Sequence, residues 1–304
     1  MKPLRIGARA SLMSLSQTAP LLAALAPQPM LFRPFSGEGG DREENRAPLE
    51  EDGVFSKGIE VALLEGEIDV AVHCLKDAPT EDTPGLKMAV YLKRDDIRDC
   101  LVTRHPEIRM RLDDLPSGEV VGTASVRRTA ALRTHRPDLK IVPLRGPINE
   151  RLQALSRGDV DAVIVASCSM ERLGLRHLIS ERISPEIICP PLGAAIIALQ
   201  TREDDTETYE RILKLNDDRT QVEAAVERLV LSRMGGFCNA PLAGYCTTDD
   251  SGTAIKHTLR ARAFTPSGGT AIDVRLTGEE PVQLAVVVCR RLIRHRALEL
   301  AGAR

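Results

Sequence analysis

The sequence predicts an α/β protein built from two α/β units followed by a smaller α+β unit. Three observations support this prediction. Short apolar segments alternate with amphipathic ones over the first two thirds of the chain, which is typical of strands covered by helices. Near residue 257 the alternation changes to period two, as expected for antiparallel strands. A chain of 304 residues also suits two or three compact domains better than one core.

The first unit is predicted from its alternating strands and helices. Its elements in chain order are a strand “LRIGA”, a helix 12–25, a strand “PMLFRP”, a helix 56–65 and a strongly buried strand “IDVAVH”. Between the second strand and the second helix lies Ser36–Asp52, a polar segment with no hydrophobic period. This composition predicts a mobile loop.

The second unit repeats the alternation from Asp99 onward. Its predicted elements are the strands “DCLVT” and “EVVGT”, a helix 126–134, a strand “LKIVPL”, a helix 148–157 and a strand “DAVIVAS”. The segment “EIICPP” and a helix after Gly193 are expected to follow. Parallel or mixed sheets with covering helices are the usual result of this order.

The third unit is predicted to begin near residue 216. A helix at about 221–233 comes first, the segments “HTLRARAFT” and “TAIDVRLTG” alternate like antiparallel strands, and 282–300 is expected to be a closing helix. The predicted domains are therefore residues 1–95 together with 193–215, residues 96–192, and residues 216–304.

The composition argues against several classes of protein. A net charge of −2 gives no overall attraction to nucleic acid or membranes, and 3% aromatic residues without Trp disfavour stacking on single-stranded bases. The longest apolar run near the N-terminus is too short to span a bilayer and does not form a signal peptide, so we expect a cytoplasmic protein, and a monomer. Seven scattered cysteines without a CxxC pair disfavour a disulfide framework and a structural metal site.

Arginines at predicted strand ends are the strongest functional signal. Arg9 ends the first strand, Arg127 and Arg128 follow “GTAS” at the start of a helix, and Arg145 and Arg151 follow “IVPL”. Ligands bind at the carboxyl ends of strands in open α/β sheets, and guanidinium groups there bind carboxylates or phosphates. One such arginine is more often a solvated charge at a helix start, but the set together predicts a multiply anionic ligand.

Asp77 is the second signal, because it follows a buried strand in “DVAVHCLKDAP”. A carboxylate at such a sheet edge can stabilise a developing cation or transfer protons. The same residue could instead be an ordinary cap or turn aspartate. His73 is expected to be a core histidine, since no other His or Cys lies at ligand spacing.

Cys238 in “RMGGFCNAPLAGYC” is the third signal. The two preceding glycines free the backbone, so the thiol could project from a loop between domains. An isolated cysteine is more often buried and inert, and its spacing from Cys246 does not suit a zinc knuckle.

Five motifs in register resemble the porphobilinogen deaminase (hydroxymethylbilane synthase) family, and they cover nearly the whole chain. The motifs are “LRIGARASLMSLSQT”, “DGVFSKGIEVALLEGEIDVAVHCLKDAPTEDTPGL”, “VVGTASVRRTAALRTHRPDLKIVPLRGPINERL”, “DAVIVASCSMERLGL” and “GGFCNAPLAGY”. One such motif would be weak, but five in the same order identify the chain as a member of this family.

The resemblance implies three α/β domains with an active cleft between the first two. It also implies a transferase that carries a dipyrromethane cofactor on a loop cysteine. Such an enzyme adds four porphobilinogen molecules head to tail, with loss of ammonia, and water then releases the linear tetrapyrrole. Each porphobilinogen has two carboxylates, which agrees with the arginines, and loss of ammonia leaves a cation that a carboxylate can stabilise.

Residue roles follow from the matched motifs. The resemblance implies that Asp77 takes the catalytic role and that Cys238 carries the cofactor thioether. It also implies that Phe55 lies at the active-site wall and that Gly40-Asp41 belong to a mobile lid. The residues expected to bind carboxylates of the cofactor or substrate are Arg9, Ser11, Lys76, Thr123, Ser125, Arg127, Arg128, Arg145 and Arg151.

Several motif positions depart from the family pattern. The departures are Gly58, Cys74, Ala124, Pro147, Ala194, Ala195 and Phe237. Ala194 and Ala195 replace a usual Gln and Gly, which removes one polar contact and adds a Cβ. These changes leave open a paralogue with altered pyrrole chemistry. The two α/β units also resemble the lobes of periplasmic solute-binding proteins, so a non-enzymatic binder of a multiply anionic ligand is a further alternative.

Overall fold

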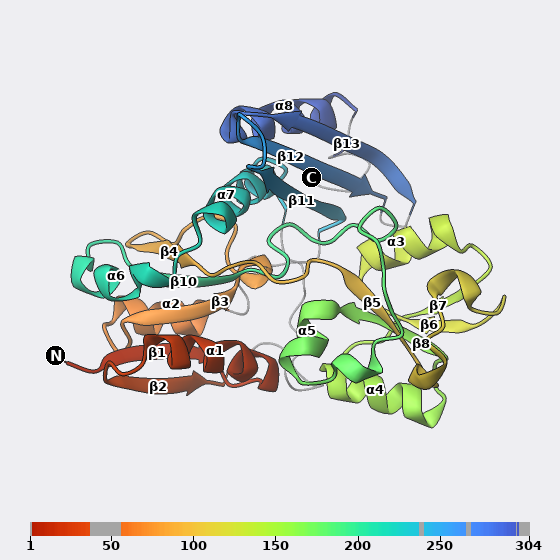
Figure 1. Ribbon diagram of the computed structural model, residues 1–304, viewed down its shortest axis with the longest axis horizontal. Helices are drawn as coiled ribbons and strands as arrows, with labels where there is room; N and C mark the ends of the chain where they lie inside the picture. Colours follow the sequence, from red (N-terminus) through yellow and green to blue (C-terminus); the bar gives the residue numbers. More distant parts are fainter. Residues whose placement is uncertain (1, 37–55, 237–239, 266–268, 296, 298–304) are drawn as a thin grey trace.

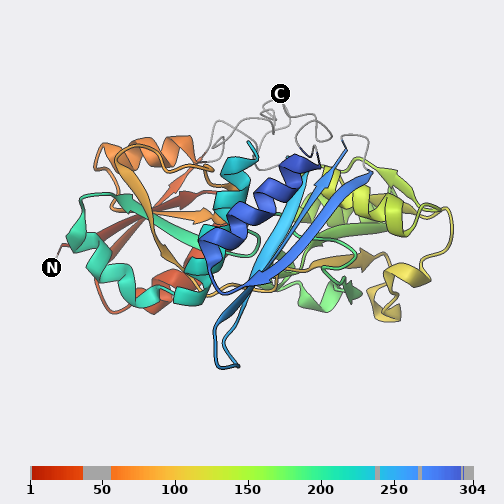
Figure 2. The ribbon, with the colours of Figure 1, turned by 90° about the horizontal axis from the view of Figure 1, so that it is seen from above.

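The structure is a computed structural model that describes residues 2–36, 56–236, 240–265, 269–295 and 297. Two α/β lobes lie side by side, and a third unit lies across both of them (Figures 1 and 2). Each unit is organised around one sheet, of five, five and three strands among the described residues. The predicted class, two similar α/β lobes with a small C-terminal α+β unit, is confirmed.

The first lobe contains a mixed sheet in the order β2-β1-β3-β10-β4. Its strands are β1 (Leu4–Arg9), β2 (Met30–Phe35), β3 (Val70–Cys74), β4 (Leu86–Tyr91) and β10 (Ile197–Arg202). β1 runs parallel to β2 and β3, whereas β10 is antiparallel to β3 and β4. Helices α1 (Leu12–Leu25) and α6 (Thr206–Ile212) pack on one face, and α2 (Lys57–Leu64) packs on the other.

The second lobe repeats this arrangement in the order β7-β6-β8-β5-β9. Its strands are β5 (Asp99–Thr103), β6 (Val120–Gly122), β7 (Lys140–Val142), β8 (Ala162–Ala166) and β9 (Glu181–Arg182). β6 is parallel to β7 and β8, and β5 is antiparallel to β8, as β10 is to β3. Helix α3 (Val126–His135) covers one face, and α4 (Ile148–Arg157) and α5 (Ser167–Arg172) cover the other.

The third unit is an antiparallel sheet of β11 (Leu242–Asp249), β12 (Lys256–Phe264) and β13 (Thr270–Gly278). Helices α7 (Asp218–Arg233) and α8 (Pro281–Arg294) cover one face and bury the largest apolar cluster of this unit. The other face packs on the second lobe, where Tyr245 and Phe264 join Ala130 and Cys189 in one cluster. This unit therefore contacts the connection between the lobes.

Short 3₁₀ segments complete the described structure. They are η2 (Leu75–Asp77), η3 (Pro106–Ile108), η4 (Leu112–Asp114), η5 (Arg176–Leu178) and η6 (Leu213–Leu215). η2 follows directly after β3 and contains Lys76 and Asp77, two of the predicted site residues.

The predicted helix after Gly193 is wrong, because this segment forms strand β10. “IALQT” is buried throughout between β3 and β4, and a short buried strand of this kind has no period that distinguishes it from a helix. The prediction also missed β11, whose apolar run is interrupted by Gly244. At Gly244 a Cβ would approach the Arg260 carbonyl oxygen to 2.5 Å, so the close β11–β12 pairing excludes a side chain there.

Candidate active site

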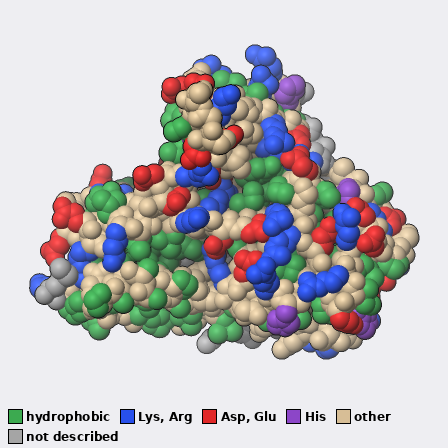
Figure 3. Space-filling view, viewed as in Figure 1, with side chains coloured by type: hydrophobic (Ala, Val, Ile, Leu, Met, Phe, Trp, Pro, Cys, Tyr) green, Lys and Arg blue, Asp and Glu red, His purple; other side chains and the backbone are tan. Residues whose placement is uncertain are grey.

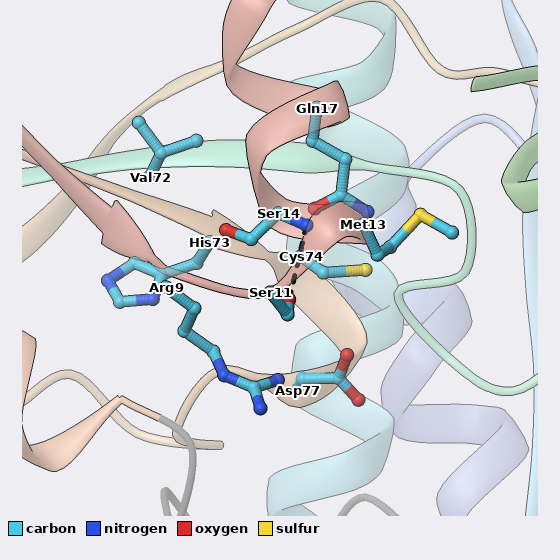
Figure 4. Close-up of a pocket in the computed structure, with 9 residues that line it drawn as sticks. All are labelled: Arg9, Ser11, Met13, Ser14, Gln17, Val72, His73, Cys74 and Asp77. Carbon is cyan, nitrogen blue, oxygen red and sulfur yellow. Dashed lines mark hydrogen bonds between the residues drawn. The ribbon is translucent and has the colours of Figure 1, made fainter. Parts of the chain in front are cut away.

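Asp77 lies where β3 ends and the chain turns into η2. β3 is buried at its first four positions, and the turn after it is held by a hydrogen bond from the Leu75 amide to the Ile196 carbonyl oxygen, 2.9 Å long. A first cavity opens beside this turn and is lined by Arg9, Ser11, Met13, Ser14, Gln17, Val72, His73, Cys74 and Asp77. In Figure 4 the side chains of Arg9 and Asp77 lie on the same side of this cavity.

Ser11 has a structural role in this cavity as the N-cap of α1. Its hydroxyl oxygen accepts a hydrogen bond from the Ser14 amide at 3.3 Å, drawn in Figure 4. The hydroxyl hydrogen of Ser11 can still be donated to another group, because the cap uses only a lone pair of the oxygen.

A second cavity lies between the two lobes and shares Asp77 with the first. It is lined by Met13, Gln17, Cys74, Lys76, Asp77, Ile97, Asp99, Arg127, Arg128, Ala166, Cys168, Ser169, Arg172, Pro191, Ala194 and Ala195. The residues come from α1, the end of β3 with η2, the start of β5, the start of α3, the β8–α5 junction and the segment 191–195. Four cationic side chains therefore surround two carboxylates.

Asp99 fixes both arginines of α3. Its carboxylate accepts hydrogen bonds from Arg127 Nη1 at 3.1 Å and from Arg128 Nε and Nη2 at 2.9 and 2.7 Å. Burial opposes ionisation, but the charges of Arg128 and Arg127 prevail and lower the pKa of Asp99 to about 2. The triad therefore keeps one excess positive charge, and its geometry is set before any ligand binds.

Four of the predicted carboxylate-binding residues line neither cavity. Thr123 is buried and Ser125 is the N-cap of α3, so both shape the loop that presents Arg127. Arg145 is exposed, because β7 ends at Val142 rather than reaching the arginine as the predicted strand does. Arg151 donates from Nε to the Gly146 carbonyl oxygen at 2.8 Å.

The segment that departs from the family pattern lies at this site. Ala194 and Ala195 both line the second cavity, and Ala195 has a φ of 61°. This left-handed conformation is costly for any residue with a Cβ, by about 1–2 kcal/mol. The neighbouring Asp95 amide donates to the Ala195 carbonyl oxygen at 3.0 Å, which helps to hold the strained residue.

Several polar residues that line the cavities were not predicted, among them Gln17, Asp99 and Arg172. Gln17 is buried on α1, three residues after Ser14 and six after the N-cap Ser11. This spacing places the three polar residues on one side of the helix, which is a signal in the sequence. Arg172 ends α5 and pairs with Asp95, and the quoted motif “DAVIVASCSMERLGL” contained it.

His73 is a buried histidine at the edge of the first cavity, as predicted. Its Nε2 lies 3.0 Å from Gln200 Oε1, and Gln200 donates to Glu60 at 2.8 Å. Gln200 therefore presents its oxygen to the ring, so Nε2 carries the hydrogen. Burial lowers the pKa of His73 to about 4 from an ordinary 6.5.

We expect this histidine to make the protein less stable in mild acid. Above pH 6.5 the ring is neutral in both states, but between pH 6.5 and 4 only the unfolded chain binds the proton, so the free energy of unfolding falls as pH falls. The full loss corresponds to about 3 kcal/mol. The free energy of unfolding, measured with urea at a series of pH values, should depend less steeply on pH in His73→Gln than in the wild-type protein. His177→Gln, at an exposed position, should keep the wild-type slope, and equal slopes for all three proteins would contradict the assignment.

Three predicted features lie outside the described residues: Phe55, Cys238, and the predicted lid segment beyond Ser36 with Gly40 and Asp41. Within the described part of the chain, no three His, Cys, Asp or Glu side chains are grouped to hold a metal ion. The same part contains no helix with the length and apolar character to cross a bilayer. On the face shown in Figure 3, acidic and basic side chains are intermingled.

Comparisons with known proteins identify the relatives of this chain. A family model described as “Porphobilinogen deaminase, dipyromethane cofactor binding domain” matches residues 4–210. The chain is 42% identical to porphobilinogen deaminase 2 of Streptomyces coelicolor, with 98% of this chain and 96% of the relative covered. It is 35% identical to porphobilinogen deaminase of Streptococcus sanguinis, with 96% of each covered.

Among solved structures, an ancestral cationic amino acid solute binding protein aligns with a TM-score of 0.43 and 16% identity, over 70% of this chain and 87% of that one. The match to the family model and the two relatives above decide the classification. The chain belongs to the porphobilinogen deaminase family.

Proposed function

We propose that this protein is a hydroxymethylbilane synthase, a transferase that condenses four porphobilinogen molecules and releases a linear tetrapyrrole. The observation that carries the proposal is the second cavity, where the Asp77 carboxylate lies among Lys76, Arg127, Arg128 and Arg172. A substrate with two carboxylates needs cations for binding, and a reaction that creates positive charge needs an anion at the reacting carbon.

The residues present fit a dipyrromethane cofactor, which bears several carboxylates. Burial, reinforced by the charge of Arg128, lowers the pKa of Arg151 to about 10. Burial likewise lowers the pKa of Arg127. Positive charge is thus in excess around α3, and an anionic group would relieve it. When bound, dipyrromethane supplies the carbon that receives the first substrate.

We assign the binding roles by cavity. Arg127 and Arg128 each keep N–H groups beyond those bonded to Asp99 and backbone oxygens, so they can still donate to a carboxylate. Lys76 adds a cation next to Asp77, and Arg9 and Ser11 add donors from the first cavity. Arg151, Thr123, Ser125 and Arg145 would act from the α3 side, where a bound chain of several pyrroles would extend.

Asp77 is the residue that acts on the reacting atoms. It lines both cavities, so it can contact a substrate that enters through either. Its carboxylate would stabilise the cation left when the aminomethyl group of porphobilinogen loses ammonia. It would also take the proton released when the new carbon–carbon bond forms.

The remaining assignments extend this proposal. Cys238 would carry the cofactor thioether, and Phe55 would form part of the wall. The first two domains, residues 1–95 with 193–215 and residues 96–192, would enclose the site, and residues 216–304 would supply the attachment loop. We propose that the enzyme works as a cytoplasmic monomer without nucleic acid, membrane or metal.

One observation favours a second candidate, a paralogue with altered pyrrole chemistry. Ala194 and Ala195 both line the second cavity, at positions where the family usually has Gln and Gly. Ala195 adds a methyl group in a strained conformation, and the side chain of Ala194 has no group that could hydrogen-bond a substrate. A less polar wall of changed shape could shorten the product or admit a modified pyrrole.

Mass spectrometry of the released product distinguishes these candidates. We expect purified protein incubated with porphobilinogen to release a linear tetrapyrrole. Release of a dipyrrole or tripyrrole would support the paralogue instead. Binding of porphobilinogen without any release of ammonia would support a non-enzymatic binder and overturn the proposed activity.

A further inference from the structure

Glu227 is a fully buried carboxylate of α7 that the proposed reaction does not use. Its side chain is 0% exposed, and it belongs to the third unit rather than to either lobe. It accepts hydrogen bonds from Arg94 Nη1 at 2.6 Å, the Gly193 amide at 2.6 Å and the Cys246 amide at 2.7 Å. One carboxylate therefore joins three separate parts of the chain.

Two of these parts are the segments that connect the lobes. The chain crosses from the first lobe to the second through 92–98 and returns through 189–196. The crossings are bonded to each other, since the Asp95 amide donates to the Ala195 carbonyl oxygen at 3.0 Å and Arg94 Nε donates to the Ala194 carbonyl oxygen at 3.0 Å. Glu227 binds one group on each crossing, Arg94 and Gly193.

The returning segment also supports the turn that contains Lys76 and Asp77. The Leu75 amide donates to the Ile196 carbonyl oxygen at 2.9 Å. Gly193, with a φ of +75°, lies so close that a Cβ built on it would be 3.0 Å from the Lys76 nitrogen and 3.2 Å from its Cα. The backbone of the 75–77 turn therefore rests directly on Gly193, whose amide is bonded to Glu227.

We propose that Glu227 is a positioning residue for Asp77, because it fixes Gly193 and thereby the 75–77 turn on which the reacting carboxylate is placed. The inference rests on the proposed function of Asp77. The third unit would then contribute to the reaction in two ways, by supplying the attachment loop and by positioning Asp77 through Glu227. Displacement of a reacting group by about 1 Å can lower the rate roughly 100-fold, so a small shift of this turn is sufficient.

Glu227→Gln tests the proposal. An amide has only one oxygen, so its NH₂ group must face either the Gly193 amide or the Cys246 amide, and one of these bonds is lost. We expect kcat per cofactor-loaded chain to fall roughly 10- to 100-fold while KM changes less than about threefold. Cofactor loading is measured by intact mass, so that loss of cofactor is not mistaken for loss of rate.

Glu223→Gln is the matched control. Glu223 lies one turn earlier on α7, contacts the same Arg94 at 3.5 Å and accepts from the Thr248 amide at 2.8 Å. Among the described residues, neither of these contacts reaches the crossing that holds Gly193. Its amide can keep the Thr248 bond. We expect this variant to keep kcat within about twofold of wild type.

A measurement without substrate separates this inference from the proposed function. Amide hydrogen exchange across residues 75–80 should become faster in Glu227→Gln and stay unchanged in Glu223→Gln. A Glu227→Gln protein with wild-type exchange and wild-type kcat would overturn the inference, as would equal losses in both variants. Wild-type protein that never turns over porphobilinogen would overturn the proposed function. The amide hydrogen exchange of residues 75–80 would still test whether Glu227 holds the 75–77 turn through Gly193.

Gly193→Ala is a second variant for the case in which Glu227→Gln does not fold. It leaves the Arg94–Glu227 pair intact and places a methyl group against the Lys76 backbone. We expect the same fall in kcat with KM little changed. Full activity in a folded Gly193→Ala protein would show that the 75–77 turn does not depend on this contact.

Discussion

Replacing Asp77 with Asn should lower the turnover of porphobilinogen at least roughly 100-fold while the cofactor stays attached. Asn has nearly the same shape as Asp but no negative charge, so it can neither stabilise a cation nor accept a proton. Asp77 lines both cavities and is surrounded by cations that would still bind substrate carboxylates. The loss should therefore be in kcat, with KM changed much less.

The measurement is ammonia release per cofactor-loaded chain, with loading taken from the intact mass. Glu81→Gln is the control, because Glu81 lies four residues later on the same loop, is exposed, and needs only one oxygen to accept from Ser232 Oγ at 3.1 Å. It should turn over normally. Turnover by Asp77→Asn within a few-fold of wild type would refute the assigned role.

The strand before Asp77 and helix α4 were predicted correctly because the sequence of each carries a local signal. The strand contains the β-branched residues Val70 and Val72 and is buried at its first four positions, and α4 carries apolar residues at helical spacing and has the predicted limits Ile148–Arg157. β10 is buried on both faces like β3, but it contains Ala198, Leu199 and Gln200, which also favour helices, so its own sequence does not separate strand from helix. Its strand character comes from pairing with β3 and β4, more than 100 residues earlier in the chain, and no local pattern contains that pairing.

The site residues that follow a strand directly in the sequence could be predicted, whereas those that depend on contacts between distant parts of the chain could not. Asp77 and Arg127 follow strands, and strand ends of one lobe meet at one sheet edge, so position alone indicated them. Asp99 was not predicted, because its role depends on the fold bringing it to Arg127 and Arg128. Glu227 has no local signal either, since its partners lie in both crossings and in β11.

The departures from the family pattern become interpretable only in the structure. In the sequence, Ala195 is one small residue in place of another. In the fold it occupies a left-handed conformation at a cavity wall, within the crossing 189–196 that Glu227 holds at Gly193. The bonds of that crossing to Arg94 and Asp95 stabilise a conformation that alanine rarely adopts. The substitution therefore changes the shape of the site without loosening it.

Replacing Cys238 with Ser should abolish both the cofactor and the activity. A serine hydroxyl is a much weaker nucleophile than a thiolate and cannot form a thioether. The other six cysteines are poorly suited to replace it. Burial raises the pKa of all six thiols. The pKa rises to about 12 for Cys74, Cys100 and Cys189, and above the ordinary value for Cys168, Cys246 and Cys289.

Intact mass after incubation with porphobilinogen measures the cofactor directly, and an acidic aldehyde reagent should give a red colour only with the loaded protein. We expect wild type to carry one dipyrromethane increment and Cys238→Ser to have the unmodified mass, with no colour and no tetrapyrrole released. Cys246→Ala is the control, since Cys246 is buried in the core of the third unit and should leave the increment in place. An increment retained by Cys238→Ser would move the attachment to another thiol, and Cys74 would be the first to test because it lines both cavities.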